Sequence, residues 1–367
     1  MDRRYAGALL IPLVLLLDAS HARAALAQAW PPFVLVAGLL LIGLVAGRDG
    51  LFDVAASRLV GLAGPPVVLL LACFALVVVV TALLNLDTSV VFLTPVLIKT
   101  ARRRGVDVNP FLYGSVFMAN ASSLFLPGSN LTNLLVLSGE RVSGAAFFAR
   151  MLPGALAAAL ITAAGIVLIH RRRLFAGGER VQESPPARLR LGLGLWGALV
   201  AASLIVILRN AALPVLAIGL ALLLARALQG RVPLRETISW LGVPVLASLF
   251  GLSVALGTLA RASAFPADLM HSAGAPLTAL VAALASVLVN NLPAAVLLSS
   301  GRHLHTGALL LGLNVGPNLA VTGSLAVLLW WRAARASGAT PSAIAYSRQG
   351  LMLAPVALLG ALALGGG

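Results

Sequence analysis

Apolar stretches of roughly 17–25 residues recur along the whole chain, and each has the length that a helix needs to cross a bilayer. Inside a bilayer every backbone N–H and C=O group needs a partner within the protein, and a helix provides one within each stretch. The 367 residues are 60% hydrophobic and only 10% charged, whereas about a quarter of a soluble domain is usually charged. The sequence therefore predicts an all-α polytopic membrane protein.

The first apolar stretch, residues 5–17, follows Arg3 and Arg4 and has the flank of a signal peptide. However, Asp18-Ala-Ser-His21 is a poor match to the small residues of a cleavage site, so we expect a retained first helix. Its basic flank predicts a cytoplasmic N-terminus in the bacterial inner membrane. Cys73 is the one cysteine of the sequence, which excludes an internal disulfide and any site built from several thiolates.

Basic residues gather in short segments between the apolar stretches, which is the distribution that the positive-inside rule produces. The net charge of +15 therefore does not indicate nucleic-acid binding. If every cluster is cytoplasmic, the first helix runs outward and the second, at about residues 30–47, returns, with residues 49–61 along the inner interface. The clusters are Arg3–Arg4, Arg48 with Arg58, Lys99–Arg104 and Arg171–Arg190.

Residues 65–100 begin and end beside basic clusters, so this segment starts and finishes on the same side. Its middle, Asn85-Leu86-Asp87, is too short for a turn outside the membrane, which predicts a re-entrant hairpin with its tip inside the bilayer. Residues 109–138 then cross once, but proline and glycine break this helix at residues 126–130. A span at about 146–169 leads to a cytoplasmic linker, residues 171–190.

The second half of the chain repeats this plan upside down, with a hairpin tip at 290–293 and a helix break at 321–324. The result is about nine spans and two hairpins in two inverted repeats, residues 1–170 and 191–367, the first one helix shorter than the second. Matching interrupted segments in two halves point to the binding site of a secondary transporter. In the second half we expect spans near 191–208, 211–228 and 238–259, a hairpin at 275–300, a broken helix at 306–332 and a last span at 343–364.

Neutral polar side chains gather at the two predicted hairpin tips and the two helix breaks. At such points half-helix N-termini present unpaired N–H groups and positive dipole ends. Taken singly, each Asn, Ser or Thr has the alternative role of hydrogen-bonding helices to one another. Their clustering at four interruptions favours a binding site for a compact polar solute or a small oxyanion. The candidate residues are Asn85, Thr88, Asn120, Ser129, Asn130, Thr132, Asn290, Asn291, Asn314, Thr322 and Ser324.

Asp87 is the one acidic residue that the sequence places at membrane depth, because the others fall in loops or at helix ends. An ionisable group there costs a few kcal/mol on insertion scales, so it is normally functional. We expect its protonation, or its binding of a cation, to be coupled to transport. The alternative role, which is compatible with the first, is that Asp87 caps the returning half-helix.

No motif for catalysis or cofactor binding is found in the sequence. His303 and His305 have the spacing of a metal pair on a strand, but no carboxylate or thiol is near them, so we expect no metal site. A P-loop, a serine–base arrangement and a metalloprotease signature are all missing. The sequence predicts neither an enzyme nor a cofactor.

Four stretches carry a recognisable pattern: LDTSVVFLTPVLI, ANASSLFLPGSNLTNLLV, VLVNNLPAAVLLSS and GLNVGPNLAVTGSLAVLLWWRAAR. From about residue 30 to residue 363, the sequence with these stretches resembles the arsenite efflux permease family of the ion transporter superfamily. The resemblance implies two inverted repeats with paired hairpins, and export of arsenite or antimonite, generally against a proton gradient. One departure is Leu86, which separates Asn85 from Asp87 where the family often has Asn-Asp adjacent. By resemblance the central substrate region holds Asn85, Asp87, Ser129, Asn130, Asn290, Asn291, Asn314 and Ser324.

The sequence thus predicts a secondary active transporter, with proton-coupled efflux of arsenite or antimonite as the leading hypothesis. Near neutral pH arsenite is largely an uncharged triol, which suits a cage of hydroxyl and amide groups. The alternative is sodium- or proton-coupled transport of a small anion such as a dicarboxylate, citrate or sulfate, or sodium/proton exchange. A structural or assembly factor would explain the helices but not the duplicated polar breaks. The implied partners are the solute, the coupling ion and the lipid bilayer, with a homodimer as one candidate assembly.

Overall fold

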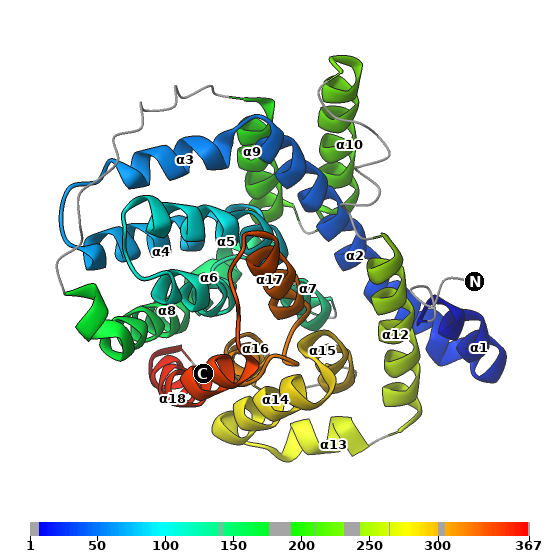
Figure 1. Ribbon diagram of the computed structural model, residues 1–367. Coiled ribbons are helices and arrows are strands. Elements are labelled where there is room, and N and C mark those ends of the chain that lie inside the picture. Colours follow the sequence, from blue (N-terminus) through cyan, green and yellow to red (C-terminus); the bar gives the residue numbers. More distant parts are fainter. Residues whose placement is uncertain are drawn as a thin grey trace.

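The computed structural model describes residues 7–138, 140, 142–175, 192–208, 210–230, 243–263, 265–299 and 305–365, and helices joined by turns and loops make up this part of the chain (Figure 1). Within this part of the chain, five helices are long and apolar enough to cross a membrane. They are α2 (Ala19–Arg48), α4 (Pro66–Leu83), α8 (Gly144–Leu174), α12 (Val243–Ala262) and α18 (Ala343–Gly365). The fold is that of a polytopic membrane protein, as predicted.

The N-terminal helix differs from the prediction. The helix expected over residues 5–17 is α1 (Leu10–Leu17), and its eight residues extend about 12 Å, less than half of a hydrocarbon core of roughly 30 Å. The second helix, expected at 30–47, is instead the 30-residue α2. It begins early because the Asp18 side chain accepts a hydrogen bond from the backbone N–H of His21 and caps the helix. The described residues therefore show no first crossing by residues 5–17.

The first half continues with α3 (Leu51–Val60) and then the hairpin of α4 and α5 (Leu86–Arg103). The broken helix consists of α6 (Asn109–Ser122), the short η2 (Pro127–Ser129) and α7 (Leu131–Leu137). α6 ends at Ser122, five residues before Pro127, because the ring of a proline inside a helix clashes with the carbonyl four residues earlier, here that of Ser123. Residues 171–174 of the predicted linker belong to α8, and residues 176–190 lie outside the described part.

The second half begins with α9 (Leu193–Ile207) and α10 (Ala212–Leu228), followed by α12 and α13 (Phe265–Ser272). The second hairpin joins α14 (Ala275–Val289) to α15 (Asn291–Leu298). The second broken helix consists of α16 (Thr306–Val315), η3 (Gly316–Leu319) and α17 (Leu325–Ala336). Here too the helix ends before the predicted break at 321–324, because Pro317 has no N–H group with which to continue α16.

The elements from α2 to α8 and from α12 to α18 follow in the same order. Each series has a long helix, a short helix, a hairpin, a helix broken by a 3-10 turn and a long last helix. α9 and α10 lie between the two series and pack against α2. Asp49, which follows α2, contacts both helices. Its carboxylate forms an ion pair with Arg226 of α10 at 2.6 Å and accepts a hydrogen bond from the N–H of Gly194 of α9 at 2.9 Å. In this order α9 and α10, which were predicted as spans of the second half, have no counterpart in the first series.

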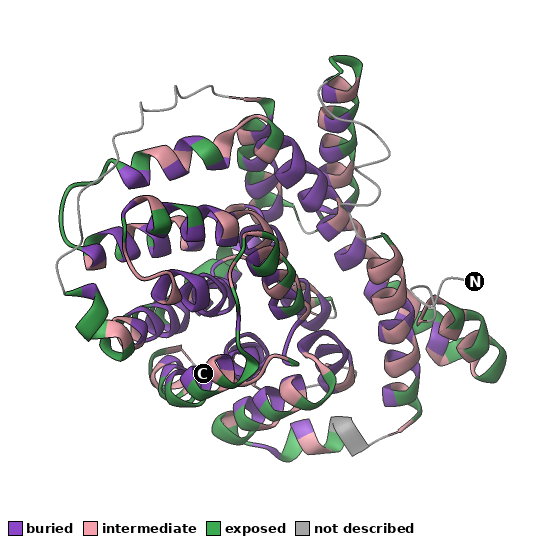
Figure 2. Cartoon of the chain, in the orientation of Figure 1, coloured by how far each residue is buried: buried purple, intermediate pink, exposed green. Residues whose placement is uncertain are grey.

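Helices of one half pack against helices of the other. α5 packs along α17, and α7 packs along α15, while α8 lies against α18. α6 and α16 are buried along almost their whole length at the centre (Figure 2). Small residues permit close contacts between the halves: a Cβ atom on Gly154 of α8 would lie 3.2 Å from the carbonyl oxygen of Ala361 in α18.

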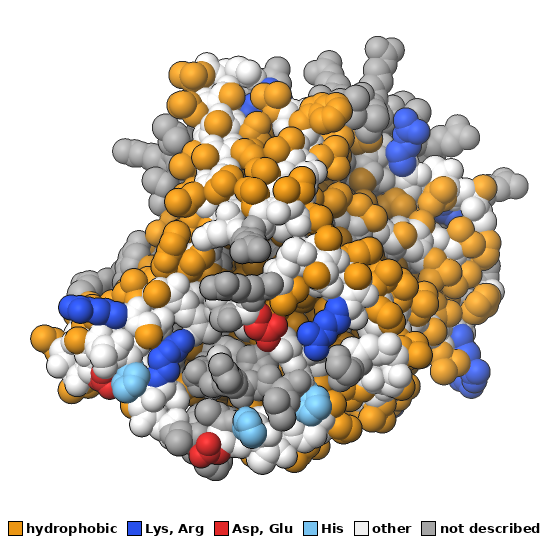
Figure 3. All heavy atoms as spheres, turned by 180° about the vertical axis from the view of Figure 1, so that it is seen from behind, with side chains coloured by type: hydrophobic (Ala, Val, Ile, Leu, Met, Phe, Trp, Pro, Cys, Tyr) orange, Lys and Arg blue, Asp and Glu red, His pale blue; other side chains and the backbone are white. Residues whose placement is uncertain are grey.

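The outer surface is largely apolar, as a bilayer requires. Figure 3 shows hydrophobic side chains over the middle of the molecule, with the visible acidic and histidine side chains in the lower half of that face. Side chains such as Leu160, Leu288 and Leu359 are 67%, 81% and 66% exposed. Leucines this exposed would promote aggregation in water, whereas in a membrane they contact the apolar acyl chains.

Candidate substrate site

Four helices begin at the two hairpin tips and the two helix breaks, and each has a polar N-cap. The cap oxygen accepts a backbone N–H of the first turn, at 2.7 Å for α5, 3.1 Å for α7, 3.3 Å for α15 and 3.3 Å for α17. Asn and Ser are favoured at this position because their short side chains reach that N–H group. All four N-caps were predicted as site residues: Asn85, Asn130, Asn290 and Ser324.

The four helices that begin at the tips and breaks are joined in two pairs by hydrogen bonds at their C-terminal ends. Arg102, near the end of α5, donates to the carbonyl oxygens of Ser337 and Gly338 behind α17, at 2.6 and 2.7 Å. The first residue of α17 lies 12 residues before Ser337. The residue that lies 12 residues before Arg102 on α5 is Val90. Because α5 and α17 also pack along each other, we infer that the N-terminus of α17 lies near Val90, about one turn from Asp87.

The second pair is α7 and α15, and Gln28 of α2 joins their C-terminal ends. Its Nε2 donates to the carbonyl oxygen of Leu135 in α7 at 3.1 Å and to Oγ of Ser299 after α15 at 3.3 Å. Its Oε1 accepts a hydrogen bond from Arg261 of α12 at 2.6 Å. α5 and α17 thus run away from the centre to one end of the molecule, and α7 and α15 run to the other.

A network of amide side chains joins the two helix breaks. Asn314 Oδ1 accepts from Ser123 Oγ at 2.6 Å and from Asn130 Nδ2 at 2.7 Å. Its Nδ2 donates to Asn133 Oδ1 and to the carbonyl oxygen of Leu310, both at 2.8 Å. Both lone pairs and both N–H groups of Asn314 are therefore used within the protein.

Asn120 takes part in a second bridge, in which its Nδ2 donates to Oδ1 of Asn318 at 2.8 Å. Asn318 and Ser123 were not predicted as site residues. Each had a signal in the sequence: Asn318 follows Asn314 by four residues, one helical turn, and Ser123 follows Asn120 by three. The structure thus connects Asn120, Asn130 and Asn314 to one another through the contacts between the two breaks.

Each hairpin tip is also hydrogen-bonded to the break of its own half. Ser129 Oγ donates to the carbonyl oxygen of Ala82 at 3.4 Å. In the second half the N–H of Asn291 donates to the carbonyl oxygen of Gly323 at 2.9 Å, and Asn290 Nδ2 donates to that of Thr322 at 3.2 Å. Hydrogen bonds therefore run from the first tip through both breaks to the second tip.

The first tip and first break hold buried polar atoms that have no hydrogen-bond partner. A buried group without a partner costs about 1–3 kcal/mol, so each is a place where a polar ligand would be stabilised. Their side chains are at most 1% exposed. The atoms are Nδ2 of Asn85, Oγ1 of Thr88, Oγ of Ser89 and Oγ1 of Thr132.

Asp87 lies in the first turn of α5, two residues after the N-cap. The N-terminal cap of this helix is Asn85, whose Oδ1 accepts the N–H of Thr88, so the alternative role of Asp87 as the cap is wrong. The equivalent residue two positions after Asn290 in the second half is Leu292. The site therefore contains a single carboxylate, near the positive dipole ends of α5 and α17.

The tips and breaks carry no cationic side chain. Segments 83–89, 120–133, 287–293 and 314–325 contain no Lys, Arg or His. The arrangement can bind a solute through hydroxyl groups, amide groups and helix N-termini, and it can hold one proton or cation at Asp87. His303 of the histidine pair lies outside the described residues.

The comparisons with known proteins agree with this architecture. A crystal structure of the Alcanivorax borkumensis YdaH transporter is similar with a TM-score of 0.59 and 13% sequence identity, over 95% of this chain and 87% of that one. No curated protein matches the chain. The family model described as "CitMHS: Citrate transporter" matches residues 3–329. The predicted kinship with ion transporters thus holds, with a different family from the one that the motifs suggested. The chain belongs to the citrate transporter family.

Proposed function

We propose that this chain is a secondary active transporter of a small carboxylate, of the class for which its family is named. The family is described as citrate transporters. The observation that carries the proposal is that hydrogen bonds join the two tips and the two breaks, and that the first tip and first break hold buried polar atoms without partners. Helix N-termini are suited to carboxylate groups because their free N–H groups and dipoles both favour negative charge.

Charge balance implies a coupling ion. Each helix N-terminus is equivalent to about half a positive charge, so four of them offset roughly two negative charges in the best geometry. Asp87 adds a negative charge of its own when it is ionised, and no cationic side chain lies in the tip and break segments. A multiply charged carboxylate therefore requires a proton on Asp87, or a bound cation such as sodium, to enter the site together with it.

The two series of elements, α2–α8 and α12–α18, support an inverted repeat. Each series holds an odd number of crossings, and α9 with α10 adds an even number, so α12 starts on the side opposite to α2. The ends of α5, α8 and α17 carry Arg103, Arg173 and Arg335, and the positive-inside rule favours the cytoplasm for such ends. The first hairpin then enters from the inside and the second from the outside, with both tips in one central region.

Proton-coupled efflux of arsenite or antimonite is the second candidate function. The observation that favours it is the neutrality of the donors: hydroxyl and amide groups match an uncharged triol without any need to offset charge. The same site residues would serve it, with Asp87 as the proton carrier.

Uptake into proteoliposomes separates the two candidates. We expect radiolabelled citrate or a dicarboxylate to accumulate under a proton or sodium gradient, and unlabelled substrate of the same class to compete. Movement of arsenite without any carboxylate uptake would replace the first candidate by the second. If correctly inserted protein moves neither solute under either gradient, both candidates are wrong.

A further inference from the structure

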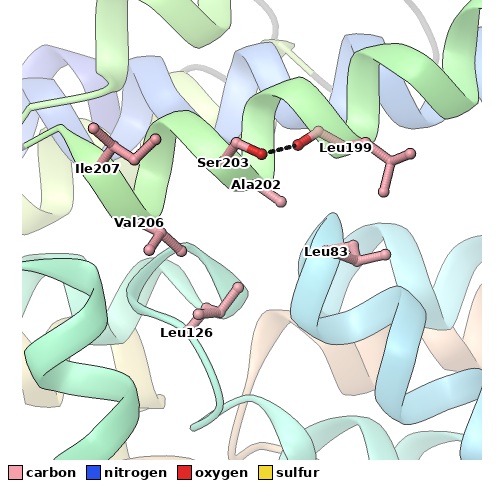
Figure 4. A pocket seen from close by; sticks show the side chains of 7 residues that line it. All are labelled: Leu83, Leu126, Leu199, Ala202, Ser203, Val206 and Ile207. Carbon is pink, nitrogen blue, oxygen red and sulfur yellow. Dashed lines mark hydrogen bonds between the residues drawn. The ribbon is translucent and has the colours of Figure 1, made fainter.

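An apolar cleft of about 390 Å³ lies between α9 and the junction of the first tip with the first break (Figure 4). Leu83, the last residue of α4, and Leu126, next to η2, line one side. Leu199, Ser203 and Val206 of α9 line the other side. The volume is in the range of small-molecule pockets, roughly 300–1,000 Å³.

The side chains that line the cleft offer few hydrogen-bonding groups to a water molecule. Ser203 is the one lining residue with a polar side chain, and its Oγ donates to the carbonyl oxygen of Leu199 at 2.9 Å. A buried water molecule needs two to four polar partners, which this lining does not supply. If the cleft were empty, its side chains would lose dispersion contacts on one side. A hydrocarbon chain in the cleft needs no hydrogen-bond partner and restores the dispersion contacts.

The cleft opens on the lipid-facing side of α9. Trp196, Val200 and Ile207 on this helix are 55%, 47% and 73% exposed, and all three are apolar or aromatic. In a chain that crosses the membrane, the medium that surrounds these side chains is the acyl-chain region of the bilayer. We propose that the cleft binds one acyl chain of a membrane phospholipid.

The proposed acyl chain would contact the outer side of the candidate site. Leu83 precedes the N-cap Asn85 by two residues, and Leu126 precedes Ser129 by three. Ser129 holds these two segments together, since its Oγ accepts the N–H of Leu126 at 3.1 Å and donates to the carbonyl oxygen of Ala82. α9 packs on this junction through the buried Ile205, and the lipid would extend that packing to Leu83 and Leu126.

Photo-crosslinking of the full chain in lipid nanodiscs tests the proposal without detergent and without a substrate. The probe is a phosphatidylcholine with a diazirine in the middle of one acyl chain, and mass spectrometry locates the labelled residues. We expect labels on Leu83 and Leu126 inside the cleft, in addition to labels on outward-facing residues such as Leu220 of α10. Ser203→Trp fills the cleft from an exposed position, so it should reduce the labels on Leu83 and Leu126 several-fold.

Val200→Trp is the matched control, because it adds the same ring to the same helix on an exposed position outside the cleft. It should leave all labels unchanged, and Leu220 should be labelled in every variant. If Ser203→Trp fails to fold, Val206→Trp fills the cleft from the next turn of α9. Labels confined to outward-facing residues in the wild type, or equal labelling of Leu83 and Leu126 in a folded cleft-filling variant, would overturn the proposal.

Discussion

At the scale of the residue, Thr88 tests whether the buried donors belong to a binding site. Its hydroxyl is fully buried and has no partner, so Thr88→Val removes a desolvation cost and should leave the free energy of unfolding unchanged or raise it by about 1 kcal/mol. The same change removes one hydrogen bond to a bound substrate, which should weaken citrate binding roughly fivefold. Thermal unfolding and calorimetric titration measure the two effects.

Thr100 provides the matched control for this substitution. It lies on the same helix, is equally buried and also has an unpaired hydroxyl, but it is 12 residues from Thr88, about 18 Å along the axis. Thr100→Val should change stability in the same direction and leave the substrate dissociation constant unaltered. Equal affinities for the Thr88→Val variant and the wild type would remove Thr88 from the site.

Asp87 is expected to carry the coupling ion. No hydrogen bond or ion pair of its carboxylate is found among the described residues, so Asp87→Asn should keep the fold. The substituted amide cannot bind and release a proton, so net uptake driven by a proton gradient should fall to background. Exchange of labelled for unlabelled substrate, which needs no net proton movement, should persist. Gradient-driven uptake at the wild-type rate in Asp87→Asn would show that this carboxylate does not couple transport.

At the scale of the element, Arg102 holds the base of the first hairpin to the second broken helix. It donates two charge-assisted hydrogen bonds to the carbonyl oxygens of Ser337 and Gly338. Because Arg102 is exposed to solvent, we expect Arg102→Gln to cost at most about 1 kcal/mol. Amide hydrogen exchange of residues 337–340 should become faster. Arg103→Gln, which removes the same charge from the neighbouring residue, should leave this exchange rate as in the wild type.

At the scale of the whole molecule, the inverted repeat predicts the side on which each end of a helix lies. Single cysteines on a Cys73→Ala background should react with an impermeant reagent from the cytoplasmic side at positions 103 and 172, and from outside at positions 210 and 268. Arg103 is the last residue of α5 and Arg172 lies at the end of α8, whereas Asn210 follows α9 and Asp268 lies in α13. Labelling of positions 103 and 268 from the same side would contradict the inverted relation of the two series.

Much of the local structure was predictable from the sequence. The apolar stretches established the helical membrane fold, because hydrocarbon forces each segment to satisfy its own backbone groups. Pro127 and Pro317 end their helices through clashes and missing donors that act within one turn. The caps Asn85, Asn130, Asn290 and Ser324 were predicted as site residues, whereas Asp87 was the one residue suggested as a cap, although a cap acts on a backbone N–H only two or three residues away.

Other features depend on partners far apart in the chain, so only the tertiary structure decided them. Asn314 and Asn133 are 181 residues apart, and their hydrogen bond uses polar groups that the sequence offered equally to a substrate. Nδ2 of Asn85 and Oγ1 of Thr88 stay without a hydrogen-bond partner because no distant polar group reaches these two atoms. The pairing of α5 with α17, and the cleft beneath α9, are likewise results of packing. A local pattern determines where a helix starts and stops, but the use of its polar groups is set by whichever segment packs against it.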